Sequence, residues 1–249
     1  MKNHFFFAYA GNKRCEVDGI LNYIQSCNFN NIDTIVEPFY GSSALSYYIS
    51  TKYPNKFNYV LNDFDENLIN LYKIVSNETK FIKFNNELNI KVKTIINKEA
   101  YNAIAKENNF LSWFIINKIY TIRAGLYKIG YDFNKQYDLN EIPIVKFLKT
   151  EKIKFFNIDG TEILKKYLNN ENTLIFLDPP YLISHNMFYS NSSYNIYEYL
   201  YANNIKNMSC FIISVLEDNW IIQLLFKDDI KQSYNKLYQG SKKHTNHLG

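Results

Sequence analysis

The sequence has 249 residues, of which 47% are hydrophobic and 21% charged, a composition typical of a globular protein with one sizeable core. The net charge of +4 is too small for the whole chain to indicate a nucleic-acid or membrane partner. Residues 80–154, however, hold 14 Lys and Arg against 7 Asp and Glu, which indicates either a phosphate-binding surface or a solvated helical face.

Neither a metal site nor a membrane segment is predicted. The three cysteines have no paired spacing and the four histidines are scattered, so we expect no metal and a cytoplasmic protein with reduced thiols. The apolar run 5–10 after Lys2 is similar to a secretion signal, but it is shorter than the roughly seven to fifteen residues that secretion needs. No later run approaches the roughly 20 residues of a membrane span. The abundance of Lys, Asn, Ile, Tyr and Phe is typical of an AT-rich bacterial, viral or phage genome.

Short β-rich runs alternate with helical patterns along the chain. The runs predicted as buried parallel strands are Thr34–Glu37, Tyr59–Asn62, Ile153–Phe156, Leu174–Leu177 and Cys210–Ile213. The helical patterns that follow them are Ser43–Ser50, Glu66–Val75, Thr161–Leu168 and Asp218–Phe226. Strand followed by helix, repeated, predicts a doubly wound α/β fold with a mostly parallel sheet.

This alternation stops between residues 78 and 150. Leu88–Lys106 and Phe110–Ile122 have helical periodicity, and an irregular stretch, Gly125–Pro143, follows. The interval coincides with the excess of basic residues. We therefore predict an inserted helical lobe at 78–150, and a main domain formed by residues 1–77 and 151–249.

Polar residues follow the predicted strands at the edge where open parallel sheets bind ligands. After the first strand, Gly41 can take a positive φ and Ser42 or Ser43 can cap the next helix. Asp63 follows the second strand, 22 residues after Gly41, a spacing that suits an acceptor for ribose hydroxyl groups. Each has a structural alternative, since Gly41 also fits a plain turn and Asp63 a helix cap.

The fourth strand ends in Asp178-Pro179-Pro180-Tyr181. The prolines fix φ and remove two N–H donors, so this stiff loop offers the Asp178 carboxylate and the prolyl carbonyls as acceptors. Such a loop suits the amino group of adenine, whose lone pair is delocalised into the ring. Acceptance of its two hydrogens, by Asp178 and by the Pro179 carbonyl, would free that lone pair to attack an electrophilic methyl group, with Tyr181 stacked on the base. The alternative is that the prolines merely end a strand.

Residues 6–13 precede the first strand and combine aromatic side chains, a glycine and a cation. Lys13 suits the carboxylate of a bound cofactor. It also fits a solvated lysine after an N-terminal turn.

Taken in order, the motifs resemble those of the Dam-like class of DNA adenine methyltransferases, over essentially the whole chain. Residues 9–13 resemble the family's opening aromatic-Ala-Gly-Gly-Lys segment, and residues 37–43 its Glu-Pro-Phe-x-Gly-x-Gly motif. Residues 62–65 resemble its acidic turn, residues 157–159 a later acidic motif, and residues 178–181 its Asp-Pro-Pro-Tyr loop. The resemblance implies S-adenosylmethionine as cofactor, a seven-stranded class I methyltransferase sheet, and a target-recognition lobe inserted before residue 157.

The resemblance also assigns roles to individual residues. The catalytic residues that it implies are Asp178, Pro179, Pro180 and Tyr181. The cofactor-binding residues that it implies are Tyr9, Ala10, Gly11, Lys13, Glu37, Pro38, Phe39, Gly41, Ser43, Asp63, Phe64, Asp159 and Asp178. The sequence departs from the family pattern at Asn12, Ser43 and Gly160, where the family has glycine, glycine and an aromatic residue. Residues 246–248 resemble the family's last core strand.

An adenine paired in a duplex must be flipped out before its amino group can react, at a cost of a few kcal/mol. Tyr181, with Phe188 or Tyr189, is a candidate to stack on the extruded base. In the lobe, Arg123 is a candidate to read guanine through O6 and N7, with a phosphate contact as the alternative. The predicted DNA contacts are Lys118, Arg123, Lys128 and Lys135.

We therefore expect an enzyme that methylates the amino group of adenine in double-stranded DNA, with a restriction nuclease for the same site as a candidate partner. Two alternatives stay open at the level of sequence. The three departures from the family pattern suggest a DNA-binding partner subunit or a weakened paralogue. The same chemistry on RNA or on a protein amide is the other alternative.

Overall fold

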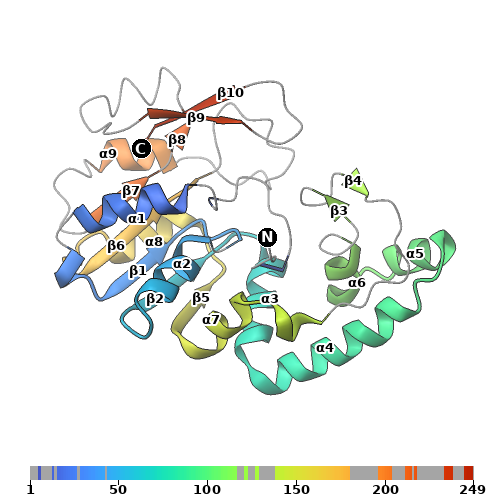
Figure 1. The fold of residues 1–249 in the computed structure, drawn as a ribbon. Helices are drawn as coiled ribbons and strands as arrows, with labels where there is room; N and C mark the ends of the chain where they lie inside the picture. The colour runs from blue at the N-terminus through green and yellow to red at the C-terminus, as the bar shows by residue number, and fades with distance from the viewer. Residues whose placement is uncertain are drawn as a thin grey trace. The chain divides into compact units, whose positions relative to one another are not determined.

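The computed structural model describes residues 5–6, 13, 16–26, 29–42, 44–116, 121–122, 127–128, 138–179, 196–203, 211–214, 216–217, 233–237 and 244–248. Within these residues, strands and helices alternate on either side of a helical interval, as the sequence predicts (Figure 1).

The main sheet has the strand order β5-β2-β1-β6-β7 in the described part of the chain (Figure 1). Its strands are β1 (Thr34–Glu37), β2 (Asn58–Asn62), β5 (Lys152–Phe156), β6 (Thr173–Leu177) and β7 (Phe211–Ser214). The four strands β2, β1, β6 and β7 are parallel neighbours. Each predicted strand is confirmed to within one residue at either end. The chain winds outward in both directions from β1, which is the order of a doubly wound sheet.

Strand β6 is buried along its whole length, as expected for the interior of a parallel sheet. Its apolar side chains pack in one cluster with those of β1, β2, α8 (Gly160–Tyr167) and α9 (Ile196–Ala202). The members of this cluster are Val36, Val60, Ile163, Leu164, Leu168, Ile175, Leu177, Ile196 and Leu200. Full burial of one such side chain contributes about 1.5–3 kcal/mol. The cluster therefore stabilises the middle of the sheet and the helices packed on it.

Seven helices precede β5 in the described residues: α1 (Val17–Ser26), α2 (Ala44–Lys52), α3 (Glu66–Ser76), α4 (Glu78–Lys93), α5 (Lys98–Ala105), α6 (Phe110–Phe114) and α7 (Ile144–Thr150). Short 3₁₀ turns form at Phe29–Asn31 and Leu139–Glu141. Asparagine side chains start three of the helices: Asn77, Asn97 and Asn109 accept hydrogen bonds from backbone N–H groups in the first turns of α4, α5 and α6. The asparagine-rich composition thus supplies good N-caps.

The helical interval differs from the prediction in two places. The pattern over Leu88–Lys106 is split between α4 and α5, because Asn97 starts a new helix, and apolar periodicity does not detect a cap. The predicted helix over Phe110–Ile122 is wrong at its end. Ile122 lies in β3 (Thr121–Ile122), which pairs antiparallel with β4 (Tyr127–Lys128) inside a stretch expected to be irregular from Gly125 onward. β-branched Thr and Ile favour a strand over a helix.

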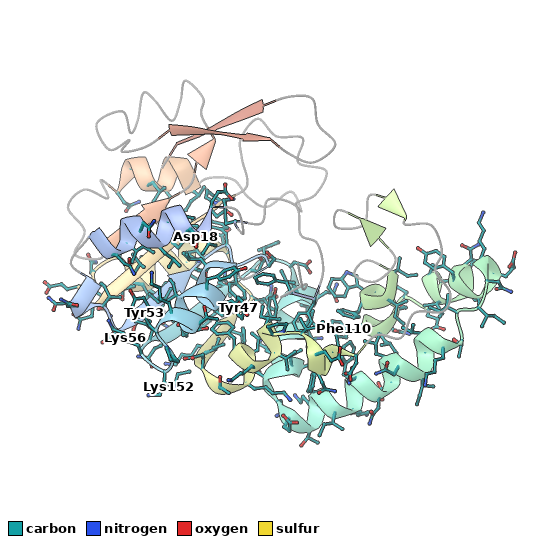
Figure 2. All side chains as sticks on the ribbon, viewed as in Figure 1. Asp18, Tyr47, Tyr53, Lys56, Phe110 and Lys152 are labelled. Carbon is teal, nitrogen blue, oxygen red and sulfur yellow. The ribbon has the colours of Figure 1, made fainter. Side chains whose placement is uncertain are left out.

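Aromatic side chains join α4 to α6. The ring of Phe84 in α4 lies 5.5 Å from the rings of both Phe110 and Phe114. Phe110, labelled in Figure 2, also stacks on Trp113 at 5.6 Å. These contacts give the helical interval an apolar core of its own.

A second, three-stranded sheet has the order β8-β10-β9 and antiparallel pairing. Its strands are β8 (Leu216–Glu217), β9 (Ser233–Leu237) and β10 (His244–Leu248). Residues 246–248 thus form a strand, as the resemblance implies, but they pair in this sheet and not in the main one. A seven-stranded main sheet stays a prediction, and the helix predicted at Asp218–Phe226 lies outside the described residues.

The chain divides into two compact units. One comprises residues 1–27, 41–56 and 66–155, and the other comprises residues 28–40, 57–65 and 156–249. This division does not test the boundaries predicted for the inserted lobe, 78–150, and they stay a prediction. In the ranges that the structure describes, no helix has the length and apolar character to span a bilayer.

Candidate active site at the carboxyl edge of the sheet

Three carboxylates stand at the carboxyl ends of adjacent strands. Glu37 is the last residue of β1, and Asp63 and Asp178 directly follow β2 and β6. Because the three strands are parallel, with Glu37 opposite Leu61, these residues meet at one edge of the sheet. Glu37 is buried, and Asp63 and Asp178 are half-buried. Strand order changes direction between β1 and β6, the place where such sheets bind ligands.

The side chain of Asn62, the last residue of β2, ties together two of the loops at this edge. Its Nδ2 donates hydrogen bonds to the carbonyl oxygens of Pro38, at 2.8 Å, and Ile158, at 2.9 Å. Its Oδ1 accepts one from the N–H of Ile158 at 3.0 Å. Its own carbonyl accepts the N–H of Tyr40 at 2.8 Å. The loop after β1 and the loop after β5 are therefore both bonded to the end of β2.

Asn157 makes a matching connection from the loop after β5. Its Nδ2 donates to the carbonyl oxygen of Asp63 at 2.8 Å and to that of Phe64 at 3.1 Å. The Asp63 carboxylate closes the turn that follows, because Oδ1 accepts the N–H of Asp65 at 2.9 Å. The acidic turn after β2 is thus held from both sides.

Asp159, one of the residues that the resemblance assigns to the cofactor, is the N-cap of α8. Its Oδ1 accepts the N–H of Thr161 at 2.7 Å and the hydroxyl of Thr161 at 2.6 Å. Within the described ranges all hydrogen bonds of this carboxylate fall on Oδ1. Oδ2 is therefore available to a ligand, and the capping role does not exclude the expected one.

Gly160, one of the departures from the family pattern, lies directly under the ring of Phe39. A Cβ atom at position 160 would stand 2.6 Å from Cζ and 2.7 Å from Cε1 of that ring, far inside van der Waals contact. The absence of a side chain at position 160 therefore makes room for an aromatic ring from the loop after β1.

The glycine turn after β1 has the predicted conformation. Gly41 has a φ of 51°, in the left-handed region that favours glycine. Its carbonyl accepts a hydrogen bond at 2.7 Å from the hydroxyl of Tyr72, a buried residue of α3. Ser42 is buried, whereas Ser43 lies outside the described residues.

The predicted catalytic loop is described as far as Pro179, which is buried. Lys13 is 3% exposed, so the alternative interpretation, a solvated lysine after an N-terminal turn, is wrong. Of the predicted DNA contacts, Lys128 is described and lies in β4. The predicted site residues that lie outside the described residues are Tyr9, Ala10, Gly11, Ser43, Pro180, Tyr181, Lys118, Arg123 and Lys135, together with Asn12, Phe188 and Tyr189.

Among the residues that the structure describes, no three His, Cys, Asp or Glu side chains are arranged to hold a metal ion. Asn62, Asn157 and Ile158 lie within the motifs at 62–65 and 157–159, but the sequence analysis assigned them no role in the site. Ile158 is 41% exposed and Phe64 is 51% exposed, although large apolar side chains are otherwise mostly buried. The place of the two asparagines near the acidic residues of these motifs was the available signal, but asparagine is too common in this sequence for its presence there to indicate a specific hydrogen-bonding role.

A parallel α/β sheet with carboxylates and a proline loop at its carboxyl edge is consistent with a methyltransferase fold. The chain belongs to the D12 class N6 adenine-specific DNA methyltransferase family, whose model matches residues 9–245. The type II methyltransferase M.MjaIII of Methanocaldococcus jannaschii is 26% identical over 205 residues, which cover 71% of this chain and 68% of that protein.

The family confirms the resemblance that the motifs indicated. The protein is an enzyme of adenine methylation in DNA. RNA or a protein amide as the substrate and a non-catalytic partner subunit are correspondingly disfavoured.

Proposed function

We propose that this enzyme transfers the methyl group of S-adenosylmethionine to the amino group of adenine in double-stranded DNA, at the carboxyl edge of the main sheet. When bound, the cofactor supplies an electrophilic sulfonium methyl group. The observation that carries the proposal is the position of Asp178 and Pro179. They follow the fully buried strand β6, beside the point where the strand order changes direction.

The side chains at this edge fit the parts of such a cofactor. Exposed apolar side chains next to fixed polar groups are typical of ligand sites. Phe64 and Ile158 are exposed on two loops that Asn157 holds together, and they suit the faces of a purine. The carboxylates of Asp63 and Asp159 suit the ribose hydroxyls and the purine amino group, respectively, because an ionised carboxylate only accepts hydrogen bonds.

The position at a strand end of this edge, or in the loop that follows, supports the assignment to the cofactor of Glu37, Pro38, Phe39, Asp63, Phe64, Asp159 and Asp178. The remaining residues assigned to the cofactor, Tyr9, Ala10, Gly11, Lys13, Gly41 and Ser43, are proposed from the family resemblance alone.

Asp178 and Pro179 act on the adenine. The Asp178 carboxylate accepts one hydrogen of the amino group and the Pro179 carbonyl accepts the other. This geometry would turn the nitrogen lone pair away from the ring and toward the methyl group. As the N–C bond formed, the methyl–sulfur bond would break and leave a neutral thioether, and one amino proton would pass through the Asp178 carboxylate to water. Acceptors already held in place by a rigid strand end need no rearrangement in the transition state, which is the main source of their effect.

An adenine within a duplex reaches these acceptors only after it has flipped out of the helix, at a cost of a few kcal/mol. Tyr181 stacks on the extruded base in our proposal and offsets part of this cost, since base stacking on an aromatic contributes about 1–3 kcal/mol. Pro180 keeps the loop stiff between the acceptors and Tyr181.

The lobe at 78–150 is proposed to recognise the DNA. Its excess of Lys and Arg supports contacts to the phosphate backbone, with Lys118, Lys128 and Lys135 as the proposed contacts. Arg123 is proposed to read guanine through O6 and N7. A restriction nuclease that cuts at the same site is the proposed partner, from the family resemblance.

Methyl transfer with labelled S-adenosylmethionine to duplex DNA, RNA and protein tests the proposal. We expect label on adenine in duplex DNA only. Asp178→Ala should lower kcat by at least about a hundredfold, while Asp18→Ala, which removes an exposed carboxylate of α1 (Figure 2), should leave kcat unchanged. Equal kcat in the parent and Asp178→Ala would overturn the catalytic role of Asp178.

A further inference from the structure

Asn62 and Asn157 form a reciprocal pair of backbone connections, which we call the asparagine brace. Asn62 belongs to the end of β2 and bonds to Ile158 in the loop after β5. Asn157 belongs to the loop after β5 and bonds to Asp63 and Phe64 in the loop after β2. Each loop is therefore fixed by a side chain of the other. The two segments are more than 90 residues apart in the sequence.

Both N–H hydrogens of the Asn62 carboxamide are donated to carbonyl oxygens of neighbouring loops. Its Nδ2 carries two hydrogens, and two carbonyl oxygens accept them, those of Pro38 and Ile158. The side chain is 1% exposed, so water cannot replace these partners. A carboxylate of the same shape would place an oxygen against both carbonyls. Only a carboxamide meets this arrangement of two acceptors and one donor.

The atoms that the brace holds are backbone atoms of the residues flanking the site. Pro38 precedes Phe39, Ile158 precedes Asp159, and the Asp63 and Phe64 carbonyls belong to the acidic turn itself. Fixed backbone positions at these points fix the origins of four side chains that the proposed function assigns to the cofactor, those of Phe39, Asp63, Phe64 and Asp159. When the loops are already ordered in the free protein, cofactor binding does not incur the entropic cost of ordering them.

We propose that the asparagine brace is a positioning device for the cofactor: Asn62 and Asn157 do not contact it, but they hold the loops after β1, β2 and β5 in the geometry that binds it. The inference rests on the proposed function, because it assumes that S-adenosylmethionine binds at this edge. The alternative is a purely structural role, in which the same bonds stabilise the fold and have no effect on binding.

The chain offers a matched control at the opposite end of the same strand. Asn58, the first residue of β2, donates from Nδ2 to the carbonyl oxygen of Asp33 at 3.3 Å. This bond also joins the β1 and β2 segments, but at the amino edge of the sheet. Val60, a buried residue in the middle of β2, provides a control for loss of stability alone.

The test compares Asn62→Asp and Asn157→Ala with Asn58→Ala and Val60→Ala. Calorimetry with S-adenosylmethionine measures the Kd of each folded variant, and thermal unfolding measures its Tm. Each variant loses two hydrogen bonds. We expect Asn62→Asp, which also places a carboxylate against two buried carbonyl oxygens, to weaken binding at least about tenfold, and Asn157→Ala, at an exposed position, at least about threefold. Asn58→Ala and Val60→Ala should bind within about twofold of the parent at temperatures well below their Tm.

A second readout needs no cofactor. The Ile158 N–H donates to Asn62 Oδ1, and amide hydrogen exchange in the free protein should be faster at Ile158 and Tyr40 in Asn62→Asp, and unchanged there in Asn58→Ala. Steady-state kinetics provide a third readout. In Asn62→Asp, the KM for S-adenosylmethionine should rise by a larger factor than kcat falls.

The outcomes separate the two proposals. A parent protein that does not bind S-adenosylmethionine would contradict the proposed function, whereas the exchange measurement would still test the brace. Binding in Asn62→Asp and Asn157→Ala within twofold of the parent would overturn the positioning role, even if Tm fell as in Val60→Ala. If Asn62→Asp does not fold, exposed Asn157 decides the question, and unchanged affinity in Asn157→Ala overturns the inference.

Discussion

The ring of Phe39 occupies the space in which a side chain at position 160 would lie, with ring atoms 2.6 and 2.7 Å from the place of a Cβ atom. Gly160 is the first residue of α8 and Phe39 belongs to the loop after β1. A side chain at position 160, where the family has an aromatic residue, would therefore displace the Phe39 ring in this structure. An aromatic ring is present at this point, but it comes from another segment of the chain.

Gly160→Ala should destabilise the protein, by about 1–3 kcal/mol, because the added methyl group forces the Phe39 ring out of its place. Gly19→Ala is the matched control, since Gly19 also lies in a helix but a Cβ atom there meets nothing within 4 Å. It should stabilise α1 by about 0.5–1 kcal/mol. Urea unfolding measures both. A stabilising Gly160→Ala would show that the Phe39 ring moves aside without cost.

Tyr72→Phe should lower the free energy of unfolding by about 1–2 kcal/mol, because the change leaves the Gly41 carbonyl without the hydroxyl that now donates to it. The ring itself is retained, and its stacking on Phe155 at 6.2 Å should persist. Tyr53→Phe is the control. Its hydroxyl accepts from Gln25 Nε2 at 2.7 Å at the surface (Figure 2), and this change should cost less than about 0.5 kcal/mol. Equal losses in the two variants would contradict the prediction.

Thr173→Val should leave stability unchanged or raise it by up to about 2 kcal/mol. Thr173 is fully buried in β6, and its Oγ1 has no hydrogen-bond partner in the described part of the structure, so valine removes an unfavourable buried polar atom at nearly constant volume. Thr161→Val should instead destabilise by about 1 kcal/mol, because Thr161 Oγ1 donates to Asp159. Thermal unfolding of the two variants should therefore give shifts of opposite sign, or a shift in Thr161→Val alone.

Asp138 makes the connection between α4 and the following 3₁₀ turn dependent on pH. The backbone N–H of Asn140 and then the side chain of Asn85 donate to its carboxylate, and these bonds lower the pKa of Asp138. The pKa of Asp138 is therefore lower in the folded protein than in the unfolded chain, where it is about 3.9. The stabilisation by these bonds is fully present when the pH is above the unfolded-state pKa, and it is lost as the pH falls through the folded-state pKa.

Asp138→Asn should accordingly lower Tm at pH 7, and the difference from the parent should shrink as the pH approaches about 3. Glu87→Gln, on the exposed face of α4, is the control and should change Tm little at either pH. A Tm difference that is the same at both pH values would contradict the role of the Asp138 charge.

Arg123→Ala should relax the sequence preference of methylation, if the guanidinium reads guanine as proposed, with a loss of discrimination of about 1–3 kcal/mol at one base pair. Lys128→Ala should instead weaken binding to all duplexes alike and reduce the dependence of log Kd on log salt by about one. Binding to a panel of duplexes with single base changes, at two salt concentrations, distinguishes these effects. Uniform weakening by Arg123→Ala would reassign this residue to a phosphate contact.

The sequence by itself determined the class of the fold, the positions of the main strands and the family. Short apolar runs bounded by polar residues are local features, and β1 and β6 were therefore predicted to within one residue. The positive φ of Gly41 was predicted for the same reason, because a tight turn depends on neighbouring residues. Asp178 and Pro179 were proposed as site residues from the sequence alone, because a carboxylate and two prolines at a strand end restrict the backbone and its donors directly.

The tertiary structure alone decided which loops are joined and which residue fills the space beside α8. Asn62 bonds to Ile158 across 96 residues, and Phe39 covers Gly160 from a different loop. Neither relationship is encoded in periodicity, since both depend on which strands are neighbours. Burial then gives the polar contacts their importance: an asparagine that is unremarkable in the sequence acquires a specific role only when folding removes water and leaves two carbonyl oxygens as its partners.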